Sequence, residues 1–334
     1  MGNKIFVTGA DGFIGSHLVE KLVDLGFNVK ALVYYNSFNN WGWLDEIDPK
    51  IKKDVEIIPG DVRDYELIKI ALKNCNFVFN LASLIGIPYS YKAPSSYIDT
   101  NIKGILNIMN ACNEYNISKI IHTSTSEVYG SAKYIPMDEM HPLNAQSPYA
   151  ASKIAADQLA LSYNKSFGTP VSIIRPFNTY GPRQSLRAII PTIITQFIDK
   201  KIKKIKLGNI NVKRDFSYIS DTVDGFVSTI KAKNISGEVI NLGNGEEVSI
   251  SEIIDLVSEI TMQKKKIEIS NDRIRNKKTE VKTLCSSNKK ARKLLSWKPK
   301  FKSKKGFKEG IEKTIEWFVK PSNLKKFKVN IYNI

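Results

Sequence analysis

The chain contains little cysteine and little histidine. Its 334 residues include three Cys and three His. The cysteines are scattered, odd in number and without redox or metal spacing, and no two histidines have metal-ligand spacing. We therefore expect reduced thiols in a cytoplasm and no metal site. The residues concerned are Cys75, Cys112, Cys285, His17, His122 and His141.

Long hydrophobic runs are also missing. No stretch reaches about 18 apolar residues, and the first residues, MGNKIFVTG, enter a strand pattern without the layout of a signal peptide. We expect no membrane segment. The 42% hydrophobic content suits an ordinary core.

Acidic residues are fewer than basic ones, which gives a formal net charge of +17. A basic surface attracts polyanions. The excess is nevertheless spread over Lys runs at 200–206, 264–266, 289–293 and 298–308, and no nucleic-acid module is recognisable. We expect no nucleic-acid partner, although the charge suits a diphosphate substrate.

A glycine turn lies near the start of the chain. An apolar run at 5–7 precedes three glycines spaced G-x-x-G-x-x-G, and helical periodicity follows over 16–25. A tight turn and a helix N-terminus of this kind can approach a pyrophosphate closely. The alternative is a glycine-rich turn without a ligand. The predicted cofactor contacts here are Gly9, Gly12, Phe13, Ile14 and Gly15.

The second predicted strand, 28–34, ends without the acidic residue that usually binds the ribose of NAD. Val33, Tyr34 and Tyr35 occupy this place, with no Arg for the phosphate of NADP. The cofactor is therefore NAD or NADP. The loop 36–44, which contains two Trp residues, either closes over this end of the site or packs in the ordinary way.

Strand-like runs alternate with helical patterns along the chain, at 55–58, 77–80, 119–123, 171–175 and 239–242. This alternation predicts an α/β fold with a Rossmann-type, doubly wound parallel sheet. Ligands of such sheets bind at the carboxyl ends of the strands. The residues expected there are Asp61, Val62, Leu81, Ala82, Ser83, Ser124, Thr125, Ser126 and Glu127.

Tyr149 and Lys153 form the candidate catalytic pair. Ser147 as N-cap and Pro148 as first helical residue place them one turn apart on one helix face. A nearby ammonium can lower the pKa of a phenol, and a base near neutral pH needs a drop of roughly 3 units. The spacing alone is weak evidence, because it also occurs in Tyr65/Lys69, Tyr115/Lys119 and Tyr129/Lys133.

The C-terminal part looks less regular. Arg187, Arg214 and Arg275 are candidates for a diphosphate clamp, because guanidinium groups pair well with phosphate oxygens. Each of them is alternatively a surface ion pair.

The expected organisation has two domains and a tail. A dinucleotide-binding domain covers 1–178 with returns near 214–242. A smaller mixed domain for the substrate covers 179–213 and 243–320, and 321–334 form a C-terminal tail.

Nearly the whole chain resembles the extended short-chain dehydrogenase/reductase family. The resemblance is carried by the glycine turn, Asp61, 81–83, Thr125, Glu127, Tyr149, Lys153, the runs RPFNTYGP and RDFSYISD, and the C-terminal segment KEGIEKTIEWF. Family members act on nucleotide sugars and keep a nicotinamide cofactor through a redox-neutral cycle. The resemblance also implies a homodimer.

The resemblance assigns roles to matching residues. Tyr149 is the base on the sugar 4-hydroxyl, Lys153 holds the nicotinamide ribose and lowers the pKa of the tyrosine, and Thr125 binds O4. Asn178 and Arg214 match positions that hold the diphosphate.

Glu127 distinguishes the reactions of the family. Epimerases tend to have a small residue at this position, whereas 4,6-dehydratases have a Glu that removes the C5 proton. Ser126 stands where some dehydratases have an acidic residue for the departing 6-hydroxyl, so Glu127 would act as base and then, with a water, as acid. We therefore expect a 4,6-dehydratase.

Two segments, VYYNSFNNWGWL and LIGIPYSY, resemble dehydratases of legionaminic acid pathways, which act on an N-acetylglucosamine nucleotide. UDP-glucuronate decarboxylases also carry a TSEVYG run and are the closest alternative enzymes. A nucleotide-sugar 4-epimerase is the other alternative enzyme. A dinucleotide-sensing scaffold is the alternative without catalysis.

Overall fold

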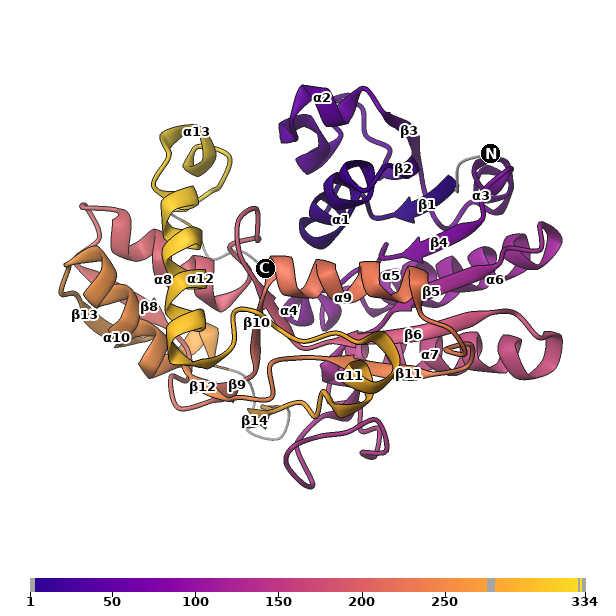
Figure 1. Cartoon of the computed structure of the whole chain (residues 1–334). Helices are drawn as coiled ribbons and strands as arrows, with labels where there is room; N and C mark the ends of the chain where they lie inside the picture. The colour runs from indigo at the N-terminus through magenta and orange to yellow at the C-terminus, as the bar shows by residue number, and fades with distance from the viewer. Residues whose placement is uncertain (1–3, 275–279, 330, 332–334) are drawn as a thin grey trace.

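The computed structural model describes residues 4–274, 280–329 and 331. Its main element is a seven-stranded parallel sheet with the order β11-β6-β5-β4-β1-β2-β3 (Figure 1). The strands are β1 (Lys4–Thr8), β2 (Asn28–Tyr34), β3 (Val55–Gly60), β4 (Phe77–Asn80), β5 (Lys119–Thr123), β6 (Val171–Pro176) and β11 (Val239–Leu242). This is the predicted Rossmann-type sheet, and its order reverses between β1 and β4, where ligands of such sheets bind.

Helices cover both faces of this sheet (Figure 1). Along β1, Ile5 and Val7 enter one apolar core and Phe6 enters the other, as the alternation of side chains in a strand requires. The first core contains α1 and α9, and the second contains α3, α6 and α7. Their bounds are α1 (Phe13–Asp24), α9 (Ile219–Lys231), α3 (Tyr65–Leu72), α6 (Gly104–Glu114) and α7 (Pro148–Phe167).

The helix α7 begins as its sequence predicts. The Ser147 hydroxyl accepts a hydrogen bond from the Ala150 amide at 3.1 Å, and Pro148 is the first helical residue. Gly168 ends the helix in the left-handed conformation, with φ at 69°. These signals fix the position of Tyr149 and Lys153 in the first two turns.

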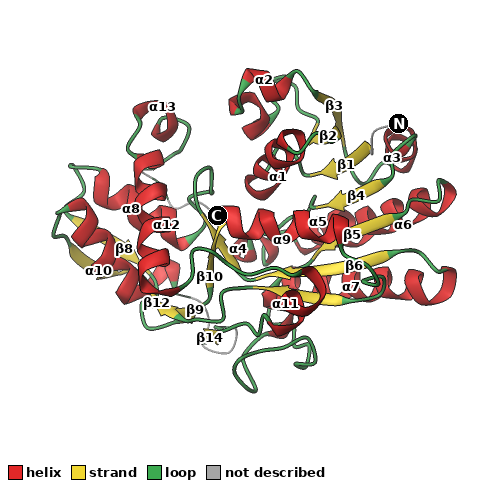
Figure 2. Ribbon diagram, viewed as in Figure 1, coloured by secondary structure: helices red, strands yellow, loops and turns green. Residues whose placement is uncertain are grey.

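The C-terminal part carries short strands and its own helices beside the large sheet (Figure 2). Its paired strands are β7 (Asn178–Tyr180) with β10 (Phe216–Tyr218), β8 (Lys204–Leu207) with β13 (Lys266–Ile269), and β9 (Lys213–Arg214) with β12 (Val248–Ser249) and β14 (Thr283–Leu284). Its helices are α8 (Ile189–Ile198), α10 (Ile250–Thr261), α11 (Lys289–Leu295), α12 (Ser303–Phe318) and α13 (Pro321–Leu324).

Short helical turns complete the described chain. They are η1 (Gly42–Glu46), α2 (Pro49–Lys52), α4 (Ile87–Ser90), α5 (Pro94–Tyr97), η2 (Ile98–Lys103), η3 (Ser126–Tyr129) and η4 (Asn271–Arg273). Among the described residues, no helix is both long and apolar enough to cross a membrane. The three cysteines are free and buried.

Candidate active site

A cavity of about 1870 Å³ lies along the carboxyl ends of the strands. It collects nearly all of the predicted site residues. Those that line it are Gly9, Gly12, Phe13, Ile14, Gly15, Asp61, Val62, Leu81, Ala82, Ser83, Thr125, Glu127, Tyr149, Lys153, Asn178, Arg187 and Arg214. Ser126 is buried outside this lining, and Arg275 falls outside the described residues.

The glycine turn needs its glycines. Gly9 has φ at 64°, and a Cβ there would lie 2.8 Å from the Ala82 nitrogen. A Cβ at Gly15 would lie 2.1 Å from the Gly9 oxygen, and one at Gly12 would lie 3.2 Å from it. The backbone therefore turns tightly and leads directly into α1, so that the N-terminus of this helix lines the cavity.

Thr8 connects β1 to β4, the two strands between which the order of the sheet reverses. Its hydroxyl donates to Asn80 Oδ1 at 2.7 Å and accepts from the amides of Leu81 and Ala82 at 3.1 and 3.0 Å. This arrangement fixes the residues after β4 beside the glycine turn. Residues 81–83 therefore form one wall of the cofactor end of the cavity.

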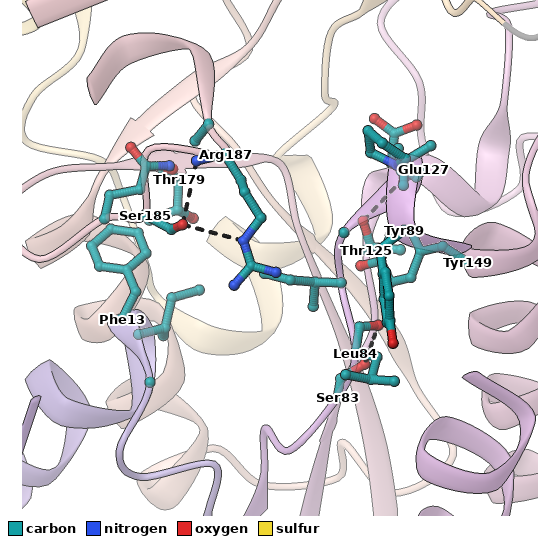
Figure 3. A pocket seen from close by; sticks show the side chains of 18 of the residues that line it. Phe13, Ser83, Leu84, Tyr89, Thr125, Glu127, Tyr149, Thr179, Ser185 and Arg187 are labelled. Atoms are coloured by element: carbon teal, nitrogen blue, oxygen red, sulfur yellow. Dashed lines mark hydrogen bonds between the residues drawn. The ribbon is translucent and has the colours of Figure 1, made fainter. Parts of the chain in front are cut away.

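Thr125, Glu127 and Tyr149 lie together across the cavity from Phe13, on the same side as Ser83 and Leu84 (Figure 3). The hydroxyls of Thr125 and Tyr149 share a hydrogen bond, and Thr125 Oγ1 also accepts from the Glu127 amide at 3.2 Å. The Tyr97 ring packs edge-on against Tyr149 with centroids 6.2 Å apart. Thr125 thus holds the phenol from one side and starts η3 from the other.

The pKa of Tyr149 shifts in the opposite direction to the expectation. Burial raises it first, and the charge of Glu127 raises it further, whereas the hydrogen bond with Thr125 lowers it. The protein alone therefore does not lower the pKa of this phenol.

Lys153 is held at the end of β5. Its Nζ donates to the Thr123 carbonyl at 2.7 Å, and burial lowers its pKa to about 8. Asp157, one turn further along α7, opposes this shift. An ammonium poised between charged and neutral forms thus lines the cavity.

Asp157 belongs to a buried polar network that was not predicted from the sequence. Its Oδ2 accepts from Ser124 Oγ at 2.8 Å and from Arg175 Nε and Nη2 at 3.1 and 2.9 Å. Arg175 Nη1 also donates to the Tyr129 hydroxyl at 3.0 Å. The available signal was the spacing of Asp157, four residues after Lys153 on the same helix.

Polar side chains from the C-terminal part line the other end of the cavity. Asn178 Oδ1 and Gln184 Oε1 are buried and have no hydrogen-bond partner in the described part of the chain, so both suit a ligand. Arg214 Nη1 donates to the Lys213 carbonyl at 2.8 Å. Among the described residues, no group of His, Cys, Asp and Glu is arranged to hold a metal ion.

Arg187 reaches into the middle of the cavity. Its Nε contacts Ser185 Oγ at 3.3 Å, and a Cβ at Gly86 would lie 3.6 Å from its Nη1. Figure 3 shows the guanidinium between Phe13 and the side that carries Tyr149. Arg187 therefore faces the candidate catalytic residues as well as the cofactor turn.

Residues 6–313 match the family model described as GDP-mannose 4,6 dehydratase. A "Putative UDP-glucose 4-epimerase" of Methanocaldococcus jannaschii is 34% identical, over 94% of this chain and 97% of the relative. The "dTDP-D-glucose 4,6-dehydratase" of Homo sapiens is 31% identical, over 94% and 89%.

A solved structure of a UDP-glucuronic acid 4-epimerase from Bacillus cereus, in complex with UDP-glucuronic acid and NAD, gives a TM-score of 0.84 at 29% identity. The match covers 95% of this chain and 99% of that one. The chain belongs to the GDP-mannose 4,6-dehydratase family of extended short-chain dehydrogenases/reductases, whose relatives include nucleotide-sugar dehydratases and epimerases.

Proposed function

We propose that the chain is a nucleotide-sugar 4,6-dehydratase that uses NAD. The observation that carries this proposal is the position of Glu127. Its carboxylate shares the cavity with the Tyr149 phenol and is close enough for its charge to raise the pKa of that phenol. Both reactions need a base for the 4-hydroxyl proton, but elimination across C5 and C6 needs a second base for the C5 proton, whereas inversion at C4 does not.

The glycine turn supports a dinucleotide cofactor, because a Cβ at Gly9 or Gly15 would clash with neighbouring backbone and disrupt the tight turn that presents the N-terminus of α1 to a pyrophosphate. The nicotinamide, when bound, supplies an acceptor and later a donor of hydride. We expect Asp61 and Val62 to contact the adenine and Lys153 to hold the nicotinamide ribose, while residues 81–83 line the cavity beside the cofactor. The pyrophosphate would bind at the glycine turn, formed by Gly9, Gly12, Phe13, Ile14 and Gly15.

Tyr149 takes the proton of the sugar 4-hydroxyl in this proposal. Thr125 already bonds to the phenol and is placed to orient O4 beside it. The ammonium of Lys153, fixed by the Thr123 carbonyl, supplies positive charge at the same end of the cavity. Loss of the C4 hydride and this proton leaves a 4-ketone.

Glu127 then removes the C5 proton, which the ketone has made acidic. The C6–O bond breaks, a C5–C6 double bond forms, and the departing hydroxyl leaves as water with a proton from the Glu127 carboxyl group. Ser126 is buried outside the lining, so we assign it no contact with the departing group. Hydride return to C6 and addition of a proton from water at C5 give the 4-keto-6-deoxy product, while Tyr149 releases its proton to water.

An N-acetylhexosamine nucleotide is the substrate that we favour. Ile85 lines the cavity and is 64% exposed, and Leu84, Ile87 and Tyr89 line the same wall. An apolar wall of this kind suits an acetamido methyl. Asn178, Arg187 and Arg214 would hold the diphosphate. We further propose that the enzyme serves a legionaminic acid pathway, forms a homodimer and works in the cytoplasm.

A nucleotide-sugar 4-epimerase is the second candidate, because the M. jannaschii relative and the B. cereus structure both carry that description. A UDP-glucuronate decarboxylase is a further candidate, because the resemblance gives such enzymes the same TSEVYG run around Glu127.

Incubation with hexose, N-acetylhexosamine and uronic acid nucleotides in heavy water separates these reactions. We expect a product that has lost one water and carries deuterium at C5, detected by mass spectrometry and NMR. A product of unchanged elemental composition would mean an epimerase, and carbon dioxide from UDP-glucuronate would mean a decarboxylase.

Glu127→Gln tests the role of the base. We expect turnover to fall by about 10²–10⁴-fold, as for loss of a general base, while C4 oxidation continues and the absorbance of reduced nicotinamide accumulates. Tyr149→Phe is the matched variant, in which we expect neither dehydrated product nor the absorbance of reduced nicotinamide. Full turnover by Glu127→Gln would overturn the proposal.

A further inference from the structure

The adenosine end of the cavity lies where β2 ends, and the usual acidic residue is missing there. The strand ends at Tyr34, whose side chain is 59% exposed. The structure places another carboxylate at this point. Asp11, from the glycine turn, accepts a hydrogen bond from the Tyr34 amide through Oδ2 at 3.2 Å and lines the same cavity.

The loop after β2 holds Asp11 in place. The Trp43 amide donates to the Asp11 carbonyl at 3.0 Å. Gly42, with φ at 57°, packs so closely that a Cβ would lie 2.5 Å from the Asp11 carbonyl oxygen and 2.9 Å from its Cβ. The loop therefore holds the backbone of Asp11, and the hydrogen bond from the Tyr34 amide orients the carboxylate at the end of β2.

A cation also lines this cavity. Arg63 follows β3 and shares the cavity lining with Tyr34 and Asp11. Its guanidinium is already paired with Asp61, since Nε lies 3.0 Å from both carboxylate oxygens. The pairing offsets the positive charge that a ribose 2′-phosphate would require.

We propose that Asp11 is the carboxylate that receives the adenosine ribose of the dinucleotide, in place of the acid missing from the end of β2. It accepts hydrogen bonds from the ribose hydroxyls and repels a 2′-phosphate, so that it selects NAD over NADP. This inference rests on the dinucleotide site of the proposed function and is independent of the reaction at the sugar.

Binding of the two dinucleotides tests this role. Purified protein, freed of any dinucleotide that it carries, is titrated with NAD and with NADP by isothermal calorimetry, without a sugar nucleotide. We expect the wild-type protein to bind NAD at least about tenfold more tightly. Asp11→Asn weakens NAD about tenfold, or about 1.4 kcal/mol, and leaves NADP nearly unchanged, so the preference is lost. Asp11→Ser repeats the comparison with a smaller side chain.

Asp45→Asn is the control that separates loss of the Asp11 carboxylate from general loosening of the loop after β2. Asp45 lies in the same loop outside the cavity lining, accepts from the Trp41 amide at 2.8 Å and pairs with Lys52 at 2.8 Å. This control should weaken both dinucleotides by a similar factor. Equal weakening of both by the Asp11 variants, or wild-type binding of NADP as tight as NAD, would overturn the assignment. A different sugar reaction would leave it intact.

Discussion

Lys153 shows at the scale of one residue how the site destabilises the fold. Its side chain is 3% exposed, and burial lowers its pKa from 10.5 to about 8. Lowering a pKa by one pH unit corresponds to about 1.4 kcal/mol, so keeping the ammonium charged inside the protein costs roughly 3 kcal/mol. The hydrogen bond to the Thr123 carbonyl offsets only about 1 kcal/mol of this.

We predict that Lys153→Met makes the protein inactive but more stable, by about 1–2 kcal/mol at pH 7. Between pH 8 and 10.5 the unfolded chain binds the proton of Lys153 and the folded protein releases it, so wild-type stability rises with pH across this window. The advantage of the variant should therefore shrink from pH 7 to pH 10.

Urea unfolding at these two pH values measures the difference. Lys165→Met, on the exposed last turn of α7, is the matched control and should show neither the gain nor its pH dependence. A stability difference for Lys153→Met that is constant from pH 7 to pH 10 would rule out burial of the charge as its cause.

At the scale of the element, α7 contains both candidate catalytic residues, Tyr149 and Lys153, and also the residue that attaches the helix to the sheet. Asp157 is fully buried and bonds to Arg175 on β6, so helix and sheet are joined by an ion pair directly behind Lys153. Removing one partner of a buried pair leaves an uncompensated charge, which is far worse than removing both.

We predict that Asp157→Asn destabilises the protein by about 3–5 kcal/mol. It also moves the pKa of Lys153 below about 8, because Asp157 holds that pKa up. The double variant Asp157→Asn with Arg175→Met should recover more than half of the lost stability in chemical denaturation. If the double variant is less stable than the single one, the pair does not act as a charge-compensated unit.

The start of α7 was predictable and its anchor was not. Ser147 and Pro148 act within one turn, so the sequence alone identifies them. The bond between Asp157 and Arg175 depends on how α7 packs on β6, which local patterns do not encode. Asp11 escaped prediction for the same reason, since its contact with Tyr34 joins two separate turns of the fold.

At the scale of the whole molecule, the loop that contacts Asp11 packs against the C-terminal segment, which here means α12 and the residues after it up to Phe327. Trp43 packs against Trp317 and Phe327 with ring centroids 5.6 and 5.8 Å apart, and Lys326 forms an ion pair with Glu46. Of the two outcomes left open for the loop 36–44, the structure shows the ordinary packing: Trp43 packs on the C-terminal segment, its amide bonds to the Asp11 carbonyl, and no residue of the loop lines the cavity.

This connection predicts that Phe327→Ala weakens dinucleotide binding although Phe327 does not line the cavity. An aromatic contact contributes about 1 kcal/mol, which corresponds to a roughly fivefold higher Kd. NAD and NADP should be affected alike, because the carboxylate of Asp11 keeps its charge. Calorimetric titration measures both constants, and Phe38→Ala, at a ring that is 89% exposed in the same loop, is the control. Unchanged affinity in Phe327→Ala would show that the loop holds its position without the C-terminal segment.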